Sequence, residues 1–196
     1  MGLRHALGAR ILPVLLVAAA VALALGGERL RLALRFDRPA IEAGEWYRLL
    51  TGHFTHLGWP HVLFNGVGSA LCWLLVGHAY SLLQWSYVIL VCLVVMDLGF
   101  WLLLPGLDWY VGLSGLLHGI LAAGAVEGLR RRAPEQMLIL ATLLAKVGYE
   151  AVAGPLPGSE SAAGGPVVTE AHLFGTIGGL LAAGLLFIGN RKRASI

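Results

Sequence analysis

A serine set between glycines is the residue in this chain whose surroundings most suggest chemistry. Ser114 lies in the run Gly112-Leu113-Ser114-Gly115, where an apolar segment begins. The glycines leave room beside the hydroxyl for a substrate carbonyl and for a neighbouring helix. At a helix N-terminus, free backbone N–H groups can also stabilise a negative oxygen. Small residues are equally typical of packed membrane helices, so the motif alone leaves packing open as the alternative.

A serine nucleophile needs a base within hydrogen-bond reach, and the sequence offers three candidates. His118 follows four residues along the same helix, where its imidazole is expected to point away from the helix start. Lys146 would give a Ser-Lys pair. His172 is followed by Gly175 and Gly179, a smooth face that can pack against the glycines of the serine's helix. We therefore predict His172 as the base; the alternative is a histidine that only caps its helix.

Two further pairs of polar residues are each spaced four apart. His61 and Asn65 share one helix face, where their donors either point at a developing negative oxygen or bond loop backbone. Lys146 and Glu150 can form an ion pair that makes both easier to place at membrane depth, and a structural role is favoured for them. Asp97 also lies in an apolar run, where an ionisable residue is a site candidate, but it has no specific predicted role.

The elements that hold these residues are predicted to be membrane helices. Apolar residues make up 58% of the 196 residues and charged ones 13%, whereas a soluble domain is nearer half and a quarter. Backbone groups in lipid must be bonded within a helix or a closed barrel, and these apolar runs show no period-two alternation. The sequence therefore predicts an all-α membrane protein and excludes a disordered chain, a collagen-like fibre and a disulfide scaffold.

Six membrane spans are predicted within a single domain over residues 1–196, with a long first loop over 27–61. The spans are expected at about 11–26, 62–79, 82–104, 111–129, 136–153 and 171–189. Basic residues collect at both termini and after the fourth span: Arg4, Arg10, Arg130, Arg131, Arg132, Arg191, Lys192 and Arg193. The positive-inside rule then places both termini in the cytoplasm, although five arginines in the first loop count against it. A cleaved secretory signal at the first span is the alternative.

Three motifs, in this order along the chain, resemble the rhomboid intramembrane serine proteases. They are Glu45-Trp46-Tyr47-Arg48-Leu49-Leu50-Thr51 followed by His56, His61 and Asn65, then Gly112-Leu113-Ser114-Gly115, then Ala171-His172-Leu173-Phe174-Gly175 with Gly179. Tyr47-Arg48 departs from the Trp-Arg that rhomboids usually have there, which weakens any inference about the packing of the first loop. The resemblance implies a six-transmembrane-helix rhomboid-like bundle.

The resemblance also implies roles for individual residues. Ser114 would be the nucleophile and His172 the general base, in a dyad without a carboxylate. His61 and Asn65 would line the oxyanion hole beside the Ser114 backbone N–H. Supporting or substrate-contacting roles are expected for His56, Gly112, Gly115, Lys146 and Glu150.

Finer details of the sequence are similar to those of one rhomboid subgroup, the rhombosortases. These details are the extended motif that ends at Gly119, the Lys146 and Glu150 pair, and the run from Val168 to His172. This resemblance implies substrates whose C-terminus carries a Gly-Gly motif, one apolar helix and a basic tail. It implies the inner membrane of a Gram-negative bacterium, with the active site opening to the periplasm. A downstream transferase that acts on the new C-terminus is a further implied partner.

Two other function classes stay open. The chain has seven histidines, with His53, His56 and His61 clustered, which leaves a haem- or metal-binding membrane protein as an alternative. A non-catalytic, client-binding relative is the other, although such relatives typically lack the serine or the histidine. We expect no cofactor, no metal and no nucleic-acid partner, since the basic residues are typical of topology signals in a bilayer protein. The Gly/Pro/Ser-rich segment 154–166 is predicted to be a mobile lid.

Overall fold

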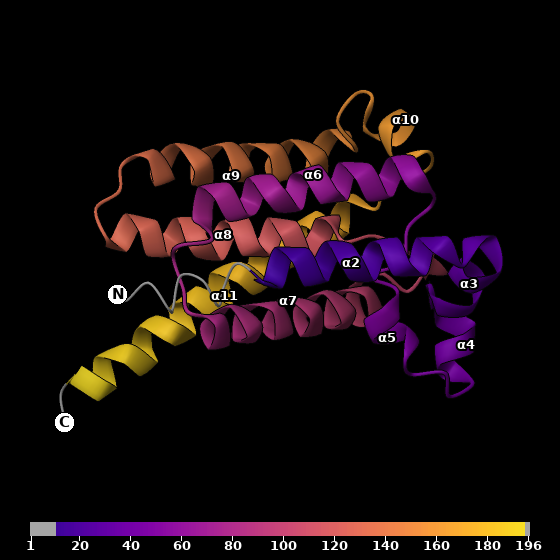
Figure 1. Cartoon of the computed structure of the whole chain (residues 1–196), viewed down its shortest axis with the longest axis horizontal. Coiled ribbons are helices and arrows are strands. Elements are labelled where there is room, and N and C mark those ends of the chain that lie inside the picture. Colours follow the sequence, from indigo (N-terminus) through magenta and orange to yellow (C-terminus); the bar gives the residue numbers. More distant parts are fainter. Residues whose placement is uncertain (1–10, 195–196) are drawn as a thin grey trace.

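The computed structural model describes residues 11–194 and shows a bundle of helices with one small sheet (Figure 1). Arg4 and Arg10, on which the predicted orientation partly rests, lie outside these residues. The long helices are α2 (Ile11–Leu25), α6 (Trp59–Val76), α7 (Leu82–Leu103), α8 (Ser114–Arg130), α9 (Glu135–Ala153) and α11 (Thr169–Ala194). Between them lie the shorter α3 (Gly27–Leu34), α4 (Arg38–Glu42), α5 (Arg48–Thr51) and α10 (Ser159–Ala163), with the strands β1 (Phe36–Asp37) and β2 (Trp109–Tyr110).

Four helices, α6, α7, α9 and α11, are long and apolar enough to cross a membrane. The bent pair α2 and α3, whose axes differ by 117°, adds a fifth if it counts as one span. Helix α8 has 17 residues, fewer than the roughly 20 that usually cross the hydrocarbon. Large apolar side chains such as Leu74, Leu83 and Val152 are exposed, as lipid-facing residues are. The chain is a multi-pass membrane protein, and the count of six spans stays a prediction.

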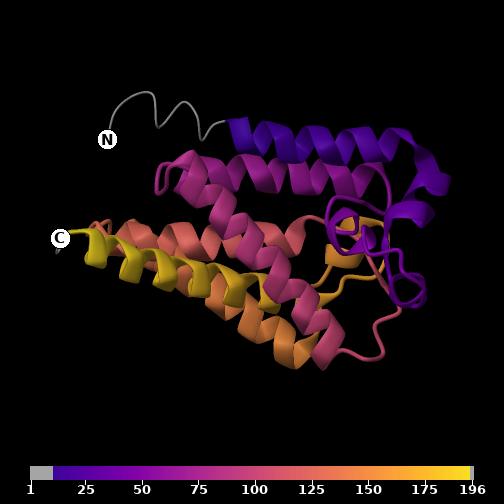
Figure 2. The same cartoon turned by 90° about the horizontal axis from the view of Figure 1, so that it is seen from below.

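Helix α8 lies at the centre of the bundle, against α6, α7, α9 and α11 (Figure 2). Eight of its 17 residues are glycine, alanine or serine, and most of the helix is buried. A Cβ added at Gly175 of α11 would overlap the carbonyl of Gly115, and one added at Gly179 would overlap the carbonyl of Gly119. The two backbones therefore touch along this glycine face, which is the packing expected from the sequence.

The long first loop is folded and bound to the bundle. Strand β1 pairs antiparallel with β2, so that the loop meets the segment that leads into α8. The Arg38 guanidinium donates to the carbonyls of Phe100 and Leu104 at 2.6 and 2.8 Å, and so covers the end of α7. Asp97, which had no predicted role, accepts from His53 Nε2 at 3.0 Å and ties the loop to α7.

Arg48 holds the loop together from within. Its side chain is buried, and it donates to the Leu32 carbonyl at 2.8 Å and to the Glu45 carboxylate at 2.8 Å. The Tyr47 hydroxyl also donates to Glu45, at 2.6 Å. These bonds from Tyr47 and Arg48 hold the pKa of Glu45 below its usual value. Tyr47 thus has a definite place in the loop although the family usually has tryptophan there.

Candidate active site

The segment before α8 fixes the position of Ser114, the first residue of that helix. Gly112 has a φ of 131°, a conformation that favours glycine, so α8 begins after it and not at residue 111 as expected. The Tyr110 hydroxyl donates to the Gly112 carbonyl at 2.6 Å, and burial raises the pKa of Tyr110, so it keeps this proton. A Cβ at position 112 would also lie 2.9 Å from the His61 imidazole. Backbone conformation and neighbouring ring both require glycine here.

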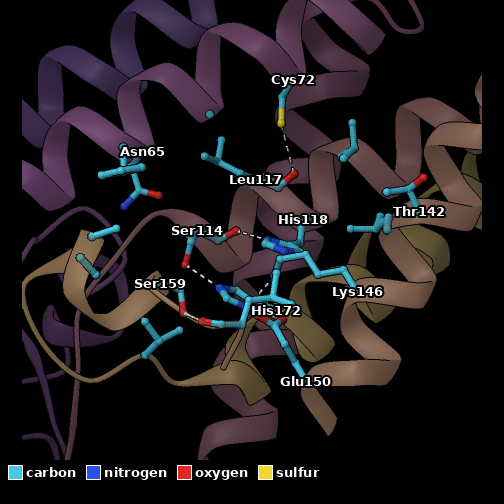
Figure 3. A pocket seen from close by; sticks show the side chains of 18 of the residues that line it. Asn65, Cys72, Ser114, Leu117, His118, Thr142, Lys146, Glu150, Ser159 and His172 are labelled. Atoms are coloured by element: carbon cyan, nitrogen blue, oxygen red, sulfur yellow. Dashed lines mark hydrogen bonds and ion pairs between the residues drawn. The ribbon is translucent and has the colours of Figure 1, made fainter. Parts of the chain in front are cut away.

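The Ser114 hydroxyl meets the imidazole of His172, which lies in the first turn of α11 (Figure 3). Ser114 Oγ is 3.0 Å from His172 Nε2, a hydrogen-bond length. The glycine contact between α8 and α11 brings the starting turns of the two helices to the same depth. A hydroxyl bonded to the Nε2 lone pair can lose its proton as the oxygen attacks, which is the arrangement of a nucleophile and its general base.

A carboxylate lies on the other edge of the same imidazole. Glu150 Oε2 is 2.8 Å from His172 Nδ1, and Lys146 Nζ donates to that same oxygen at 2.7 Å. Since a carboxylate only accepts, Nδ1 carries the proton and Nε2 is left to accept from the serine hydroxyl. The ion pair between Lys146 and Glu150 was expected, whereas its contact with His172 was not. The arrangement differs from the dyad without a carboxylate that the family resemblance implies.

His118 lies beside the pair and does not act on the hydroxyl. Its Nδ1 donates to the Ser114 backbone carbonyl at 2.7 Å. Its ring stacks on that of His172, with centroids 4.1 Å apart and planes 12° from parallel. His118 therefore fixes one face of the His172 ring, a role that the sequence analysis missed. Its spacing of four residues from Ser114 was the only signal for it in the sequence.

His61 and Asn65 line the cavity that Ser114 opens into, on its α6 side. Asn65 is buried, and its Nδ2 has no hydrogen-bond partner among the described residues. His61 Nδ1 accepts from the Leu57 backbone N–H at 3.4 Å, so its other nitrogen carries the proton. N–H donors beside a nucleophile are what an oxyanion hole needs.

His56 lies behind His61, away from the cavity. The two rings meet edge to face with centroids 4.8 Å apart, and His56 Nδ1 donates to the Phe54 carbonyl at 3.0 Å. Burial lowers the pKa of His56 to about 4, so the ring is neutral at physiological pH. His56 thus supports the position of His61 without adding charge beside it.

A cavity of about 720 Å³ is lined by the polar side chains described above other than His56, namely His61, Asn65, Ser114, His118, Lys146, Glu150 and His172. Apolar side chains from α6, α8 and α9 make up most of its wall, among them Phe64, Leu75, Leu121, Leu138 and Leu143. Helix α10, within the segment predicted as a lid, lines it with Ser159, Ala162 and Ala163. The polar groups therefore lie in one part of a space that otherwise suits an apolar chain. Mobility of the lid stays a prediction.

Within the described residues, one group has the composition of a metal site: His118, Glu150 and His172, whose ligand atoms lie within 4.8 Å of one another. The two imidazole planes are nearly parallel, so their in-plane lone pairs do not converge on one point. The carboxylate oxygen that faces His172 already accepts from Lys146. The geometry fits proton transfer better than metal binding.

A family model for the rhomboid domain matches residues 43–189, which is most of the chain. The chain belongs to the rhomboid family. Rhomboids are generally intramembrane serine proteases, and every residue of the site described above falls within the matched range. A search of curated proteins finds no match to this rhomboid.

Proposed function

We propose that this rhomboid is an intramembrane serine endopeptidase with Ser114 as nucleophile and His172 as general base. The observation that carries the proposal is the 3.0 Å contact between Ser114 Oγ and His172 Nε2, in a cavity enclosed by membrane helices. Polar groups at membrane depth are costly and are usually there for function. Packing alone does not account for a serine hydroxyl bonded to an imidazole, because the close contacts between α8 and α11 are made by glycines and backbone atoms beside these two side chains.

The proposed reaction is acyl transfer to the serine followed by hydrolysis. Ser114 Oγ bonds to the scissile carbonyl carbon while its proton passes to His172 Nε2. The carbonyl oxygen becomes negative and is stabilised by the Ser114 backbone N–H, His61 and Asn65. The C–N bond then breaks, and the departing amine takes the proton from His172. Water, deprotonated by the same nitrogen, hydrolyses the ester and restores Ser114.

The proposed substrates are secreted proteins that end in a Gly-Gly motif, one apolar helix and a basic tail. This class rests on the resemblance to rhombosortases, and the apolar wall of the cavity is compatible with such a helix. The proposed location is a bacterial inner membrane, with both termini in the cytoplasm and the site open to the periplasm. A transferase that modifies the released C-terminus would then act after this enzyme.

Ser114→Ala and His172→Ala are each expected to abolish cleavage of a Gly-Gly-tailed substrate by purified protein in liposomes. His78→Ala, which changes an exposed histidine in the turn after α6, is the matched control and is expected to cleave normally. A fluorophosphonate probe is expected to label the wild type and His78→Ala but not Ser114→Ala. Labelling that persists in Ser114→Ala would show that the nucleophile is another residue.

A substrate series identifies the sorting signal separately from the chemistry. We expect cleavage of a reporter that carries the full C-terminal signal, and its loss when the Gly-Gly pair is replaced by Leu-Leu. Mass spectrometry of the released reporter gives the scissile bond. Equal cleavage of both reporters contradicts the proposed substrate class while leaving the protease itself in place.

A further inference from the structure

We propose that Glu150 is a positioning residue for His172, so that this rhomboid uses a Ser-His-Glu triad. The inference rests on the proposed roles of Ser114 and His172. Its basis is a line of three groups: serine hydroxyl, imidazole and carboxylate, joined at 3.0 Å and 2.8 Å across opposite edges of one ring. A carboxylate in this place holds the ring in the tautomer that accepts the serine proton, and stabilises the imidazolium that forms.

The position of Glu150 is built by the bundle. Glu150 lies near the end of α9 and reaches across to the first turn of α11, with only 3% of its surface exposed. The imidazole of His172 is likewise buried. An unpaired carboxylate in such surroundings would take up a proton, so a partner of opposite charge is needed to keep it ionised.

Lys146 supplies that charge. Its Nζ donates to Glu150 Oε2 at 2.7 Å from one turn earlier on α9, and its side chain is 29% exposed. The same oxygen accepts from His172 Nδ1, and Lys146 Nζ lies 3.3 Å from that nitrogen. When His172 takes the serine proton, the carboxylate faces two cations, and when it returns the proton, the ion pair with Lys146 remains. Glu150 therefore stays charged through both halves of the reaction.

A structural pair is the alternative explanation for these contacts. Lys146 and Glu150 satisfy each other within one helix turn, and such a pair needs no histidine. Glu150 nevertheless also contacts His172, and it does so at Nδ1, the ring nitrogen that does not face Ser114. His118 stacks on one face of the ring and leaves both edges free for these two bonds. Ring face and both ring edges are thus fixed, as a base in a reactive orientation requires.

The decisive variant is Glu150→Gln, which keeps the shape of the side chain and removes its charge. Glu170→Gln is the matched control, because Glu170 is exposed and lies in the same turn of α11 as His172. We expect Glu150→Gln to lower kcat by about 10²- to 10⁴-fold, with KM changed by no more than about twofold. Glu150→Asp is expected to recover part of this loss, and Glu170→Gln to match the wild type.

The pH dependence of kcat/KM tests whether the charge of Glu150 acts on His172. The titratable or charged groups around His172 are His61, Ser114, His118, Lys146 and Glu150. Loss of the negative charge in Glu150→Gln should move the acid limb of the profile to lower pH. A pair that only attaches α9 to α11 would not lower kcat selectively when its charge is removed and the protein stays folded.

Fluorophosphonate labelling distinguishes a failure of this inference from a failure of the proposed function. If the wild type is not labelled, or Ser114→Ala still is, the proposed function is wrong. If the wild type is labelled and Glu150→Gln reacts at the same rate with the same pH profile, the triad is wrong and the dyad stands. Where Glu150→Gln does not fold, as judged by size-exclusion in detergent, Glu150→Asp decides: a kcat equal to that of the wild type overturns the triad.

Discussion

Asn65 is buried, its Nδ2 has no hydrogen-bond partner in the part of the chain that the structure describes, and it lies one helix turn from His61 in the wall of the cavity. Because the transition-state oxygen is its proposed acceptor, we expect Asn65→Ala to lower kcat by about 10²- to 10³-fold with little change in KM. Ser69→Ala is the control, since Ser69 is buried and unpartnered one turn further along α6 and does not line the cavity. Measurement is by cleavage kinetics in liposomes, and equal kcat values for the two variants would remove Asn65 from the oxyanion hole.

At the residue scale, the sequence could predict types and spacings but not contacts between helices. Gly175 and Gly179 pointed to His172 as the partner of Ser114 because small residues indicate where helices approach. No comparable signal connects Glu150 with His172. That contact depends on the rotation of α9 relative to α11, which the packing of the whole bundle sets.

The glycine face between α8 and α11 is the element on which the site depends most directly. A Cβ at Gly175 meets backbone that cannot move aside, whereas one at Gly184, further along the same helix, meets nothing within 4 Å. We expect Gly175→Ala to lower the free energy of unfolding by about 1–3 kcal/mol and Gly184→Ala to leave it unchanged or slightly raised. Thermal unfolding in detergent measures both.

The cleavage activity of the same two variants tests independently whether the glycine face positions Ser114 and His172. Separation of the helix starts would lengthen the contact between Ser114 and His172, so Gly175→Ala is expected to lose cleavage even at temperatures where it is folded. Normal cleavage by folded Gly175→Ala would mean that the glycine face contributes to stability but does not set the geometry of the site.

At the element scale, the long helices were predictable and the short ones were not. The apolar run at 82–104 predicted a helix, and the structure has α7 at Leu82–Leu103. The agreement is close because composition changes sharply at both ends of this run. The elements inside the first loop had no such signal. Helices α4 and α5 and strand β1 have two to five residues each and depend on distant partners such as the carbonyls that Arg38 binds at the end of α7.

The orientation of the whole molecule can be tested with two matched cysteines. Glu160 in α10 lies at the site end and Glu135 begins α9 at the other end; both are exposed, whereas native Cys72 and Cys92 are buried. With the site open to the periplasm, a membrane-impermeant maleimide should label Glu160→Cys in cells with a permeabilised outer membrane. Glu135→Cys should react only after lysis. The reverse pattern would invert the proposed topology.

Helix α8 places two different demands on one stretch of sequence. It is buried along most of its length against four other helices, and its glycines lie where neighbouring atoms approach most closely, at Gly115, Gly119, Gly124 and Gly128. Ser114 and His118 differ from these glycines, because their side chains are only half-buried and border the cavity. Close packing of the bundle thus explains the glycines of α8, and the proposed chemistry explains its first residue.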